Sequence, residues 1–308
     1  MTDIMTVTGP VAPGSLGVTH SHEHVLWDYW RLISSYDCIF DDEDVATAEL
    51  EAFRAAGGGA MVDASTVGIR TDPLALRRIS ERSGVRLVLG AGWYRERLYP
   101  REVFEKTVPH LAEDLIAGIS SGVDGTDVRA GVIGEIGTER GAISPAEERV
   151  FRAAARAHRE TGVAILTHTT HFGELALAQI ELLRDAGVAP DRLIISHLGD
   201  RVDHRLLLEI AATGVYLSVD NVGYAGSGYP SDEVRADSVA RLVREGYGDR
   251  VVLGCDISAK TQLATFGGHG YSWLLNSFVP LLAERGLDEA QLHRLTTANI
   301  AEALEPRT

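Results

Sequence analysis

Eight short runs of apolar and often β-branched residues recur along the chain, and longer segments separate them. Runs that are apolar at almost every position are typical of parallel strands buried on both faces. The separating segments carry apolar residues at helical spacing, as expected of helices that cover such a sheet. This alternation predicts an α/β protein and favours a (β/α)8 TIM barrel. The runs are the strand that ends at 22–24, then 59–63, 85–89, 130–133, 163–166, 193–196, 215–218 and 251–253.

Several helix boundaries are marked by capping residues. Ser144, Pro145 and Glu147 form the pattern of a capping box with a proline in the first turn. Gly162 stands where a helix should stop before the next strand. The sequence predicts helices over 44–55, 103–119, 147–158, 175–186, 233–245, 271–285 and 288–304.

A doubly wound open sheet is the main structural alternative to the barrel. Such a fold would normally carry a glycine-rich phosphate-binding turn after its first strand. Neither G-x-G-x-x-G nor a P-loop pattern occurs there, and the glycines at 57–59 precede a strand instead of following one. No linker-like or low-complexity stretch interrupts the chain, so we expect residues 1–308 to form a single domain.

Composition narrows the class of partner. The net charge of −15 argues against nucleic acid and anionic membranes, which require a basic surface. No apolar run approaches the roughly 20 residues of a membrane span, and the first residues lack the order of a signal peptide. Two cysteines provide no disulfide framework, so a reduced, cytoplasmic location is expected.

The first strand ends in three histidines spaced two residues apart, His20, His22 and His24. Alternate residues of an extended strand point to the same face, so the three imidazoles should share one face. We expect His22 and His24 to form half of a divalent-metal site, because neutral imidazole nitrogens suit such ions. His20 lies deeper in the strand and is expected to be a polar group of the barrel interior.

Further histidines and carboxylates follow four of the later runs. Barrel enzymes carry function at the carboxyl ends of their strands, so these residues should meet at one rim. Two divalent ions about 3.5–4 Å apart need a bridging anion, which a glutamate can supply, while imidazoles bind without adding charge. An aspartate could bind one ion, orient a bridging hydroxide and accept its proton, which makes hydrolysis the expected reaction class. The predicted metal ligands are His22, His24, Glu135, His168, His197 and Asp256, and Asp256 is also the predicted catalytic residue.

With these motifs, the sequence resembles the phosphotriesterase-related family of the amidohydrolase superfamily. The resemblance implies that His22, His24 and Asp256 hold the more buried ion, and that His168 and His197 hold the more exposed one. Glu135 occupies the position where organophosphate-degrading members carry a carbamylated lysine and another branch carries glutamate. The matching stretches are 17–24, 62–66, 90–94, 131–138, 167–169, 195–197, 253–256 and 266–271.

The resemblance implies a binuclear metal-dependent hydrolase that acts on a lactone or other carboxylic ester through a metal-bridging hydroxide. The alternatives are an N-acyl amide, an organophosphate triester, or, in another class of protein, a barrel that binds a small molecule without catalysis. Zinc is the expected metal, although such ligands also accept Mn, Co, Fe or Ni. A small-molecule substrate is expected, and a homodimer is common in the family.

Substrate contacts are expected from two loops. Trp93 and Tyr94 follow the third run and could form a pocket wall, with Tyr94 donating a hydrogen bond to the substrate. The segment 257–271 is long for a strand-to-helix loop and could form a specificity lid that carries Lys260 and His269.

Three further residues near the predicted rim have open roles. Arg95 and Arg97 are rim charges or could pair with a substrate carboxylate. His171 could line the pocket or be solvated in a loop.

Overall fold

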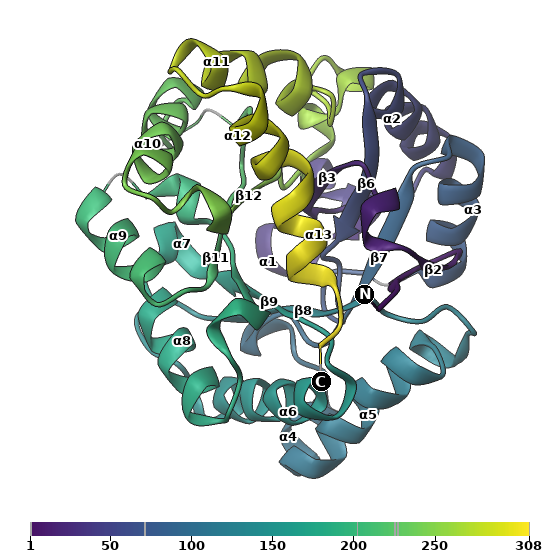
Figure 1. The fold of residues 1–308 in the computed structure, drawn as a ribbon. Coiled ribbons are helices and arrows are strands. Elements are labelled where there is room, and N and C mark those ends of the chain that lie inside the picture. Colours follow the sequence, from purple (N-terminus) through teal and green to yellow (C-terminus); the bar gives the residue numbers. More distant parts are fainter. Residues whose placement is uncertain (1, 71, 202, 225, 227, 308) are drawn as a thin grey trace.

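Eight parallel strands form one sheet that curls into a barrel, as predicted (Figure 1). The computed structural model describes residues 2–70, 72–201, 203–224, 226 and 228–307, and only the backbone of 171 and 172. In sheet order the strands are β12 (Val251–Leu253), β11 (Tyr216–Val219), β10 (Leu193–Ile195), β9 (Ile165–Thr169), β8 (Val132–Thr138), β7 (Arg86–Ala91), β6 (Gly58–Asp63) and β3 (Val18–Glu23).

The first and last strands of this sheet meet just beyond β12. The backbone N–H of Asp256 donates a hydrogen bond of 3.2 Å to the carbonyl oxygen of His22. A Cβ atom at Gly254 would lie 2.8 Å from that same oxygen, so a residue without a side chain is required there. This close approach brings the segment that carries Asp256 against the strand that carries His22 and His24.

Helices surround the barrel, and their caps follow the sequence. The capping box of Ser144 and Glu147 is present at α6, and Gly162 ends that helix in the left-handed conformation with φ of 74°. The expected helix over 103–119 is divided in two, because Pro109 cannot continue a helix from the preceding turn. The main helices are α2 (Glu43–Ala55), α3 (Pro73–Ser83), α4 (Arg101–Glu105), α5 (Val108–Ser120), α6 (Pro145–Thr161), α8 (Ala176–Asp185), α9 (His204–Ala212), α10 (Asp232–Arg244), α11 (Val279–Glu284), α12 (Glu289–His293) and α13 (Asn299–Leu304).

Two of these helices, α3 and α9, lie between predicted strands, where the β/α alternation places helices, although no bounds were given for them. The last two predicted helices contain π-helical turns. The π turns lie at Leu274–Phe278 and Arg294–Ala298, before α11 and α13 respectively. The described part of the chain also contains short 3-10 helices, two short antiparallel strand pairs and two short α-helices. The strand pairs and α-helices are β1 (Ile4–Thr6) with β2 (Gly9–Val11), β4 (Trp27–Asp28) with β5 (Ile39–Phe40), α1 (Trp30–Ile33) and α7 (Thr170–Gly173).

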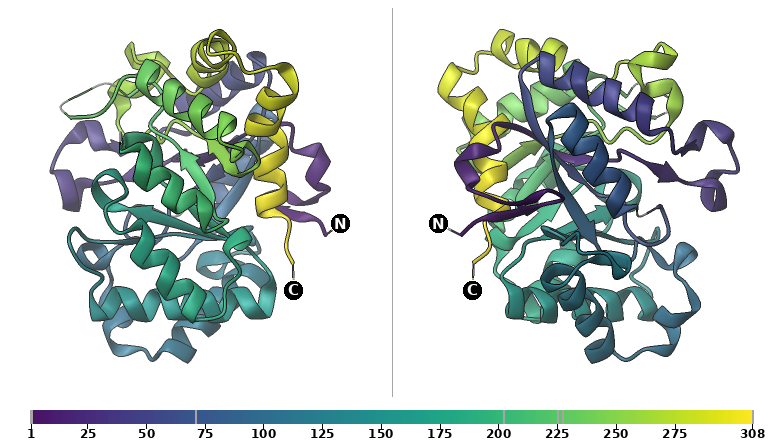
Figure 2. Two further views of the ribbon diagram at one scale, coloured as in Figure 1. Left: turned by 60° about the vertical axis from the view of Figure 1, so that its left-hand side comes forward. Right: turned by 90° about the vertical axis from the view of Figure 1, so that its right-hand side faces the viewer.

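The two ends of the barrel differ in what covers them. Ile300 and Leu304 of α13 pack with barrel-interior residues such as Val62 and Val88, which closes the end at the amino termini of the strands. Figure 2 shows α13 and both chain termini at this end and α1 at the opposite one. The carboxyl ends of the strands therefore open toward α1, where the predicted site lies. In the described part of the chain, no helix combines the length and apolarity needed to cross a membrane.

Candidate metal centre

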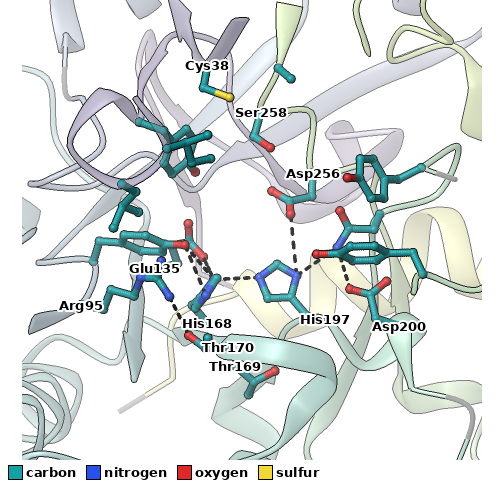
Figure 3. A pocket seen from close by; sticks show the side chains of 18 of the residues that line it. Cys38, Arg95, Glu135, His168, Thr169, Thr170, His197, Asp200, Asp256 and Ser258 are labelled. Atoms are coloured by element: carbon teal, nitrogen blue, oxygen red, sulfur yellow. Dashed lines mark hydrogen bonds and ion pairs between the residues drawn. The ribbon is translucent and has the colours of Figure 1, made fainter. Parts of the chain in front are cut away.

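All six predicted ligands come together at the carboxyl ends of the strands. Their ligand atoms form three overlapping groups, within each of which the atoms lie no more than 4.8 Å apart. Figure 3 shows Glu135, His168, His197 and Asp256 converging at the floor of a pocket. The three groups are His22, His24 and Glu135; His22, His197 and Asp256; and Glu135, His168 and His197.

The rings of His22 and His24 are held through their Nδ1 atoms. His24 Nδ1 lies 2.9 Å from Ser65 Oγ, and the Ser65 hydroxyl donates to the carbonyl of Leu26. The serine oxygen must therefore accept from Nδ1–H, which leaves the Nε2 lone pair of His24 facing the centre. His22 Nδ1 has the corresponding contact of 2.9 Å with Ser196 Oγ.

Glu135 lies at the centre of the group and is almost completely buried. Its Oε2 lies 3.0 Å from His168 Nδ1 and 3.4 Å from His22 Nε2, and its Oε1 lies 3.4 Å from His24 Nε2. Within the described part of the chain, Glu135 Oε1 and His22 Nε2 have no hydrogen-bond partner. Buried polar atoms that lack a hydrogen-bond partner are costly, and cations placed among them would satisfy them. The residues present therefore fit a metal site.

Asp220 orients His197, the fourth imidazole. Its Oδ1 accepts from the His197 backbone N–H and lies 2.9 Å from His197 Nδ1, so the Nε2 atom points inward to within 2.8 Å of His168 Nδ1. His197, Asn221 and Asp256 have φ angles of 63°, 61° and 49°, in the left-handed region that side chains rarely adopt. The chain turns sharply at these residues as it leaves β10, β11 and β12, and strain of this kind is often found at functional sites.

The pKa values of the group report a buried pocket that attracts positive charge. Burial lowers the pKa of His22 to about 4, so this ring is neutral, the form that binds metals. Burial raises the pKa of Glu135 to about 8, although His24 and His197 favour its charged form. Burial also opposes a charge on His197, but Asp220 outweighs it and raises that pKa to about 10. Bound cations would replace such protons.

Asp256 carries the carboxylate that is more open to the pocket. Its Oδ1 lies 3.2 Å from His24 Nε2 and 3.5 Å from His22 Nε2, and its side chain is 14% exposed. Burial favours its neutral form, but His22, His24 and His197 together lower its pKa to about 2. Asp256 is therefore ionised at neutral pH and available as a ligand or proton acceptor.

A pocket of about 420 Å³ lies over these side chains, within the usual size range for small-molecule sites. Tyr94 lines it, and its hydroxyl lies 3.2 Å from His168 Nε2. The structure does not bring the other three predicted substrate contacts, Trp93, Lys260 and His269, into the pocket lining.

Their positions explain why. Trp93 is buried in the hydrophobic core, as its neighbour Tyr94 is, but only Tyr94 also lines the pocket. Lys260 begins a short helical turn whose other end, Gln262, lines the pocket. The ring of His269 packs near Trp273 and against the backbone of Gly223.

Some residues of the site were not singled out as functional in the sequence. Tyr29, whose hydroxyl lies 2.9 Å from His24 Nε2, lines the pocket, and Ser65 and Ser196 hold two of the imidazoles. Ser196 directly follows β10 and Ser65 lies two residues beyond β6, and this position after a strand was the signal that could have identified them. The side chain of His171 lies outside the described residues.

His20 does not share the face of His22 and His24. The pairing of β3 with β6 is irregular between His20 and Glu23. As a result the ring of His20 packs edge-on against Phe53 of α2, at 4.5 Å, and its Nδ1 lies 2.6 Å from Glu23 Oε1. The expectation that His20 faces the barrel interior was therefore wrong.

Comparison with known proteins gives consistent matches over the whole chain. The model of the phosphotriesterase family matches residues 2–304. An N-acetyltaurine hydrolase of Tetraodon nigroviridis is 33% identical, with 98% of this chain and 97% of that protein covered. Among solved structures, a resiniferatoxin-binding protein of Rhodobacter sphaeroides has a TM-score of 0.93 at 31% identity, covering 99% of this chain and 95% of that one. A lactonase of Listeria monocytogenes has a TM-score of 0.93 at 29% identity, with both chains fully covered.

Proposed function

This chain belongs to the phosphotriesterase family and is a metal-dependent hydrolase, and we propose that it cleaves a carboxylic acyl bond in a small molecule. The observation that carries the proposal is the convergence of four imidazoles and two carboxylates, with unpartnered acceptor atoms, at the floor of a pocket. A lactone or other carboxylic ester is the first candidate substrate. The similarity to a lactonase over the full length of both chains supports it.

We assign the metal ligands as the sequence predicted them. In the division that the family resemblance implies, His22, His24 and Asp256 would hold one divalent ion, His168 and His197 a second, and Glu135 would serve both. The contacts of Asp256 Oδ1 with His22 and His24, and of Glu135 with His22, His24 and His168, support it. Bound there, the ions would lower the pKa of water and polarise the bond under attack. Zinc is the proposed metal, because imidazole and carboxylate ligands suit it.

The chain's own residues supply the proton transfer and the orientation. Asp256 is ionised at neutral pH and faces the pocket, so it would accept the proton of the attacking water and pass it to the leaving group. Burial raises the pKa of Tyr94 well above its usual value, so its hydroxyl stays protonated and can donate to the oxygen of the substrate carbonyl.

An N-acyl amide is the second candidate, supported by the 33% identity to an N-acetyltaurine hydrolase over nearly the whole chain. An organophosphate triester is the third and would be a side activity. Glutamate at position 135 gives the site a different anion from the carbamylated lysine of the organophosphate-degrading branch.

The test is an assay of metal-reconstituted protein against matched panels. Purified chain, loaded with zinc, would be offered γ- and δ-lactones, N-acyl amides including N-acetyltaurine, and aryl phosphotriesters, with the metal-stripped protein as control. We expect hydrolysis of the lactones or of the N-acyl amides, and loss of this activity when the metal is removed. Elemental analysis should find about two metal ions per chain. Turnover confined to the phosphotriesters, or equal rates without metal, would contradict the proposal.

We also propose a cytoplasmic location, a homodimer and a single folding domain over residues 1–308. Two buried, free cysteines support a reducing compartment. Exposed Trp30, Ile33 and Tyr36 beside the pocket entrance support a protein contact. Cell fractionation tests the cytoplasmic location, and light scattering tests the homodimer. Calorimetry tests the single domain, which should unfold in one transition.

A further inference from the structure

One arginine of the pocket wall has more hydrogen-bonding capacity than its neighbours use. Arg95 lines the pocket beside Tyr94 and His168, and its side chain is only 14% exposed. Its Nη1 donates to Thr170 Oγ1 at 3.0 Å, while the buried Nε has no partner in the described part of the chain. A guanidinium carries five N–H donors, so a ligand that enters the pocket can take the remaining ones.

The neighbouring contacts fix the orientation of this guanidinium. The hydroxyl of Thr170 donates to the carbonyl of Thr138, so its oxygen is left to accept from Arg95. The guanidinium carbon lies 5.1 Å from the centre of the Tyr94 ring, in the range of a cation–π contact. Figure 3 shows Arg95 on the Glu135 and His168 side of the pocket, with Asp200 on the His197 side. The arginine is therefore preorganised next to the proposed reaction centre.

The charge of Arg95 is incompletely neutralised. Its nearest carboxylate, Glu139, lies 3.6 Å from Nη1 and is shared with Arg97, whose Nε is 3.9 Å away. Arg97 also lines the pocket, but its side chain is 65% exposed, whereas that of Arg95 is 14% exposed. An incompletely paired cation in a water-poor pocket attracts anions strongly.

We propose that Arg95 binds an acidic group of the substrate, so that the preferred substrates are acyl compounds that carry a carboxylate or sulfonate. Both groups present oxygen pairs that match the donor fork of a guanidinium. The acid would lie on the Tyr94 side of the pocket, while the scissile carbonyl lies over Glu135 and Asp256. This inference rests on the proposed acyl hydrolase function and specifies its substrate class.

The test compares substrates that differ only in charge. The first pair is N-acetyltaurine and its neutral methyl sulfone analogue, and the second is a γ-lactone with and without a ring carboxylate. For Arg95→Gln we expect KM for the anionic member to rise by about tenfold to a hundredfold, with less change in kcat, while the neutral member changes less than twofold. Arg95→Lys should keep part of the preference for the anionic substrate, because lysine retains the positive charge but lacks the paired donors of the guanidinium.

A matched control removes a positive charge nearby without touching the pocket. Arg101 lies on α4, is 89% exposed and pairs with Glu105, so Arg101→Gln should leave both members of each pair unchanged. An equal loss for anionic and neutral substrates in Arg95→Gln would indicate a structural role and overturn the proposal. Hydrolysis of both members of a pair by the wild-type chain, with no preference for the anionic member, would also overturn it.

Binding measured without turnover separates this inference from the proposed reaction. The Asp256→Asn variant would be titrated calorimetrically with N-acetyltaurine and with its sulfone, in the presence and absence of Arg95→Gln. Tighter binding of N-acetyltaurine than of its sulfone, lost when Arg95→Gln is added, supports the inference. This holds even if the wild-type chain hydrolyses neither compound, because a lack of hydrolysis counts only against the proposed reaction. Equal binding of both compounds would overturn the inference.

Discussion

Two groups of histidine and carboxylate side chains meet at the end of β3, and they differ in how fully their carboxylates are satisfied. In the first group, Glu135 Oε1 and His22 Nε2 have no donor in the described part of the chain. In the second group, His20 Nε2 also has no partner in the described part of the chain, but both oxygens of Glu23 accept hydrogen bonds, from the backbone N–H groups of Cys255 at 2.6 Å and Ile257 at 3.2 Å. His20 Nδ1 provides a third partner at 2.6 Å.

Both groups contain ligand atoms close enough together to hold a metal ion, so proximity alone does not distinguish them. The satisfied carboxylate of Glu23 has little left to offer a cation, and burial raises the pKa of the Cys255 thiol well above its usual value, which keeps it protonated. Instead, Glu23 ties β3 to the backbone on both sides of Asp256. The first group is suited to bind metal, and the second positions the chain segments that carry the first.

The largest expected effect comes from removing the carboxylate of the unsatisfied group. Glu135→Ala should reduce bound metal below two ions per chain and lower turnover by about 10⁴-fold, because both proposed ions lose their shared anion. Elemental analysis and kcat measured on the same preparation check this. Full metal content in the variant would show that Glu135 does not lie between the ions.

Asp256→Asn tests proton transfer within the same group. The amide retains an oxygen for the metal but cannot accept a proton, so kcat should fall by roughly 10²–10³-fold while the melting temperature stays close to that of the wild type. Stopped-flow kinetics and thermal unfolding measure the two quantities. A rate within a few fold of wild type would exclude Asp256 as the proton acceptor.

Asp220→Asn tests the partner of a proposed ligand. Asp220 accepts from Nδ1 of His197 and fixes which nitrogen points inward, so the amide should weaken metal affinity or activity by about 10–100-fold. Chelator competition gives the affinity. An unchanged affinity together with unchanged activity would mean that the His197 ring is held by other contacts.

Glu23→Gln, for which we expect the smallest effect, tests the second group, in which the carboxylate of Glu23 is fully hydrogen-bonded. A side-chain amide can accept with one oxygen only, and its NH₂ group would face a backbone N–H, so stability should fall by about 1–3 kcal/mol. Turnover should fall severalfold as Asp256 shifts, while metal content stays at two ions per chain. Denaturant unfolding, kcat and elemental analysis check the three expectations.

Glu49→Gln is the matched control for Glu23→Gln. Glu49 is also buried and also accepts two backbone N–H groups, those of Ala264 and Thr265, but they lie beyond the ligand-bearing segment. Glu49→Gln should lower the free energy of unfolding by a similar amount but leave kcat unchanged. Loss of metal from Glu23→Gln but not from Glu135→Ala would reverse the roles assigned to the two groups.

The sequence alone predicted the barrel and the six residues of the candidate centre. Both predictions depend on local rules, because apolar runs mark buried parallel strands and the carboxyl ends of such strands meet at one rim. His168 and Asp256 could therefore be placed together although 88 positions of the sequence separate them. The ends of α6 were equally predictable, since Ser144, Glu147 and Gly162 act within one helix.

Only the tertiary structure decided which way the side chains of irregular segments point. One irregularity in the pairing of β3 turned His20 toward α2, and alternation along the strand could not reveal it. Tyr29 and Arg95 reach the pocket from loops, whereas Lys260 and His269 do not, because loop conformation depends on contacts with distant parts of the chain. Periodicity is a property of regular backbone, and the substrate contacts lie where that regularity ends.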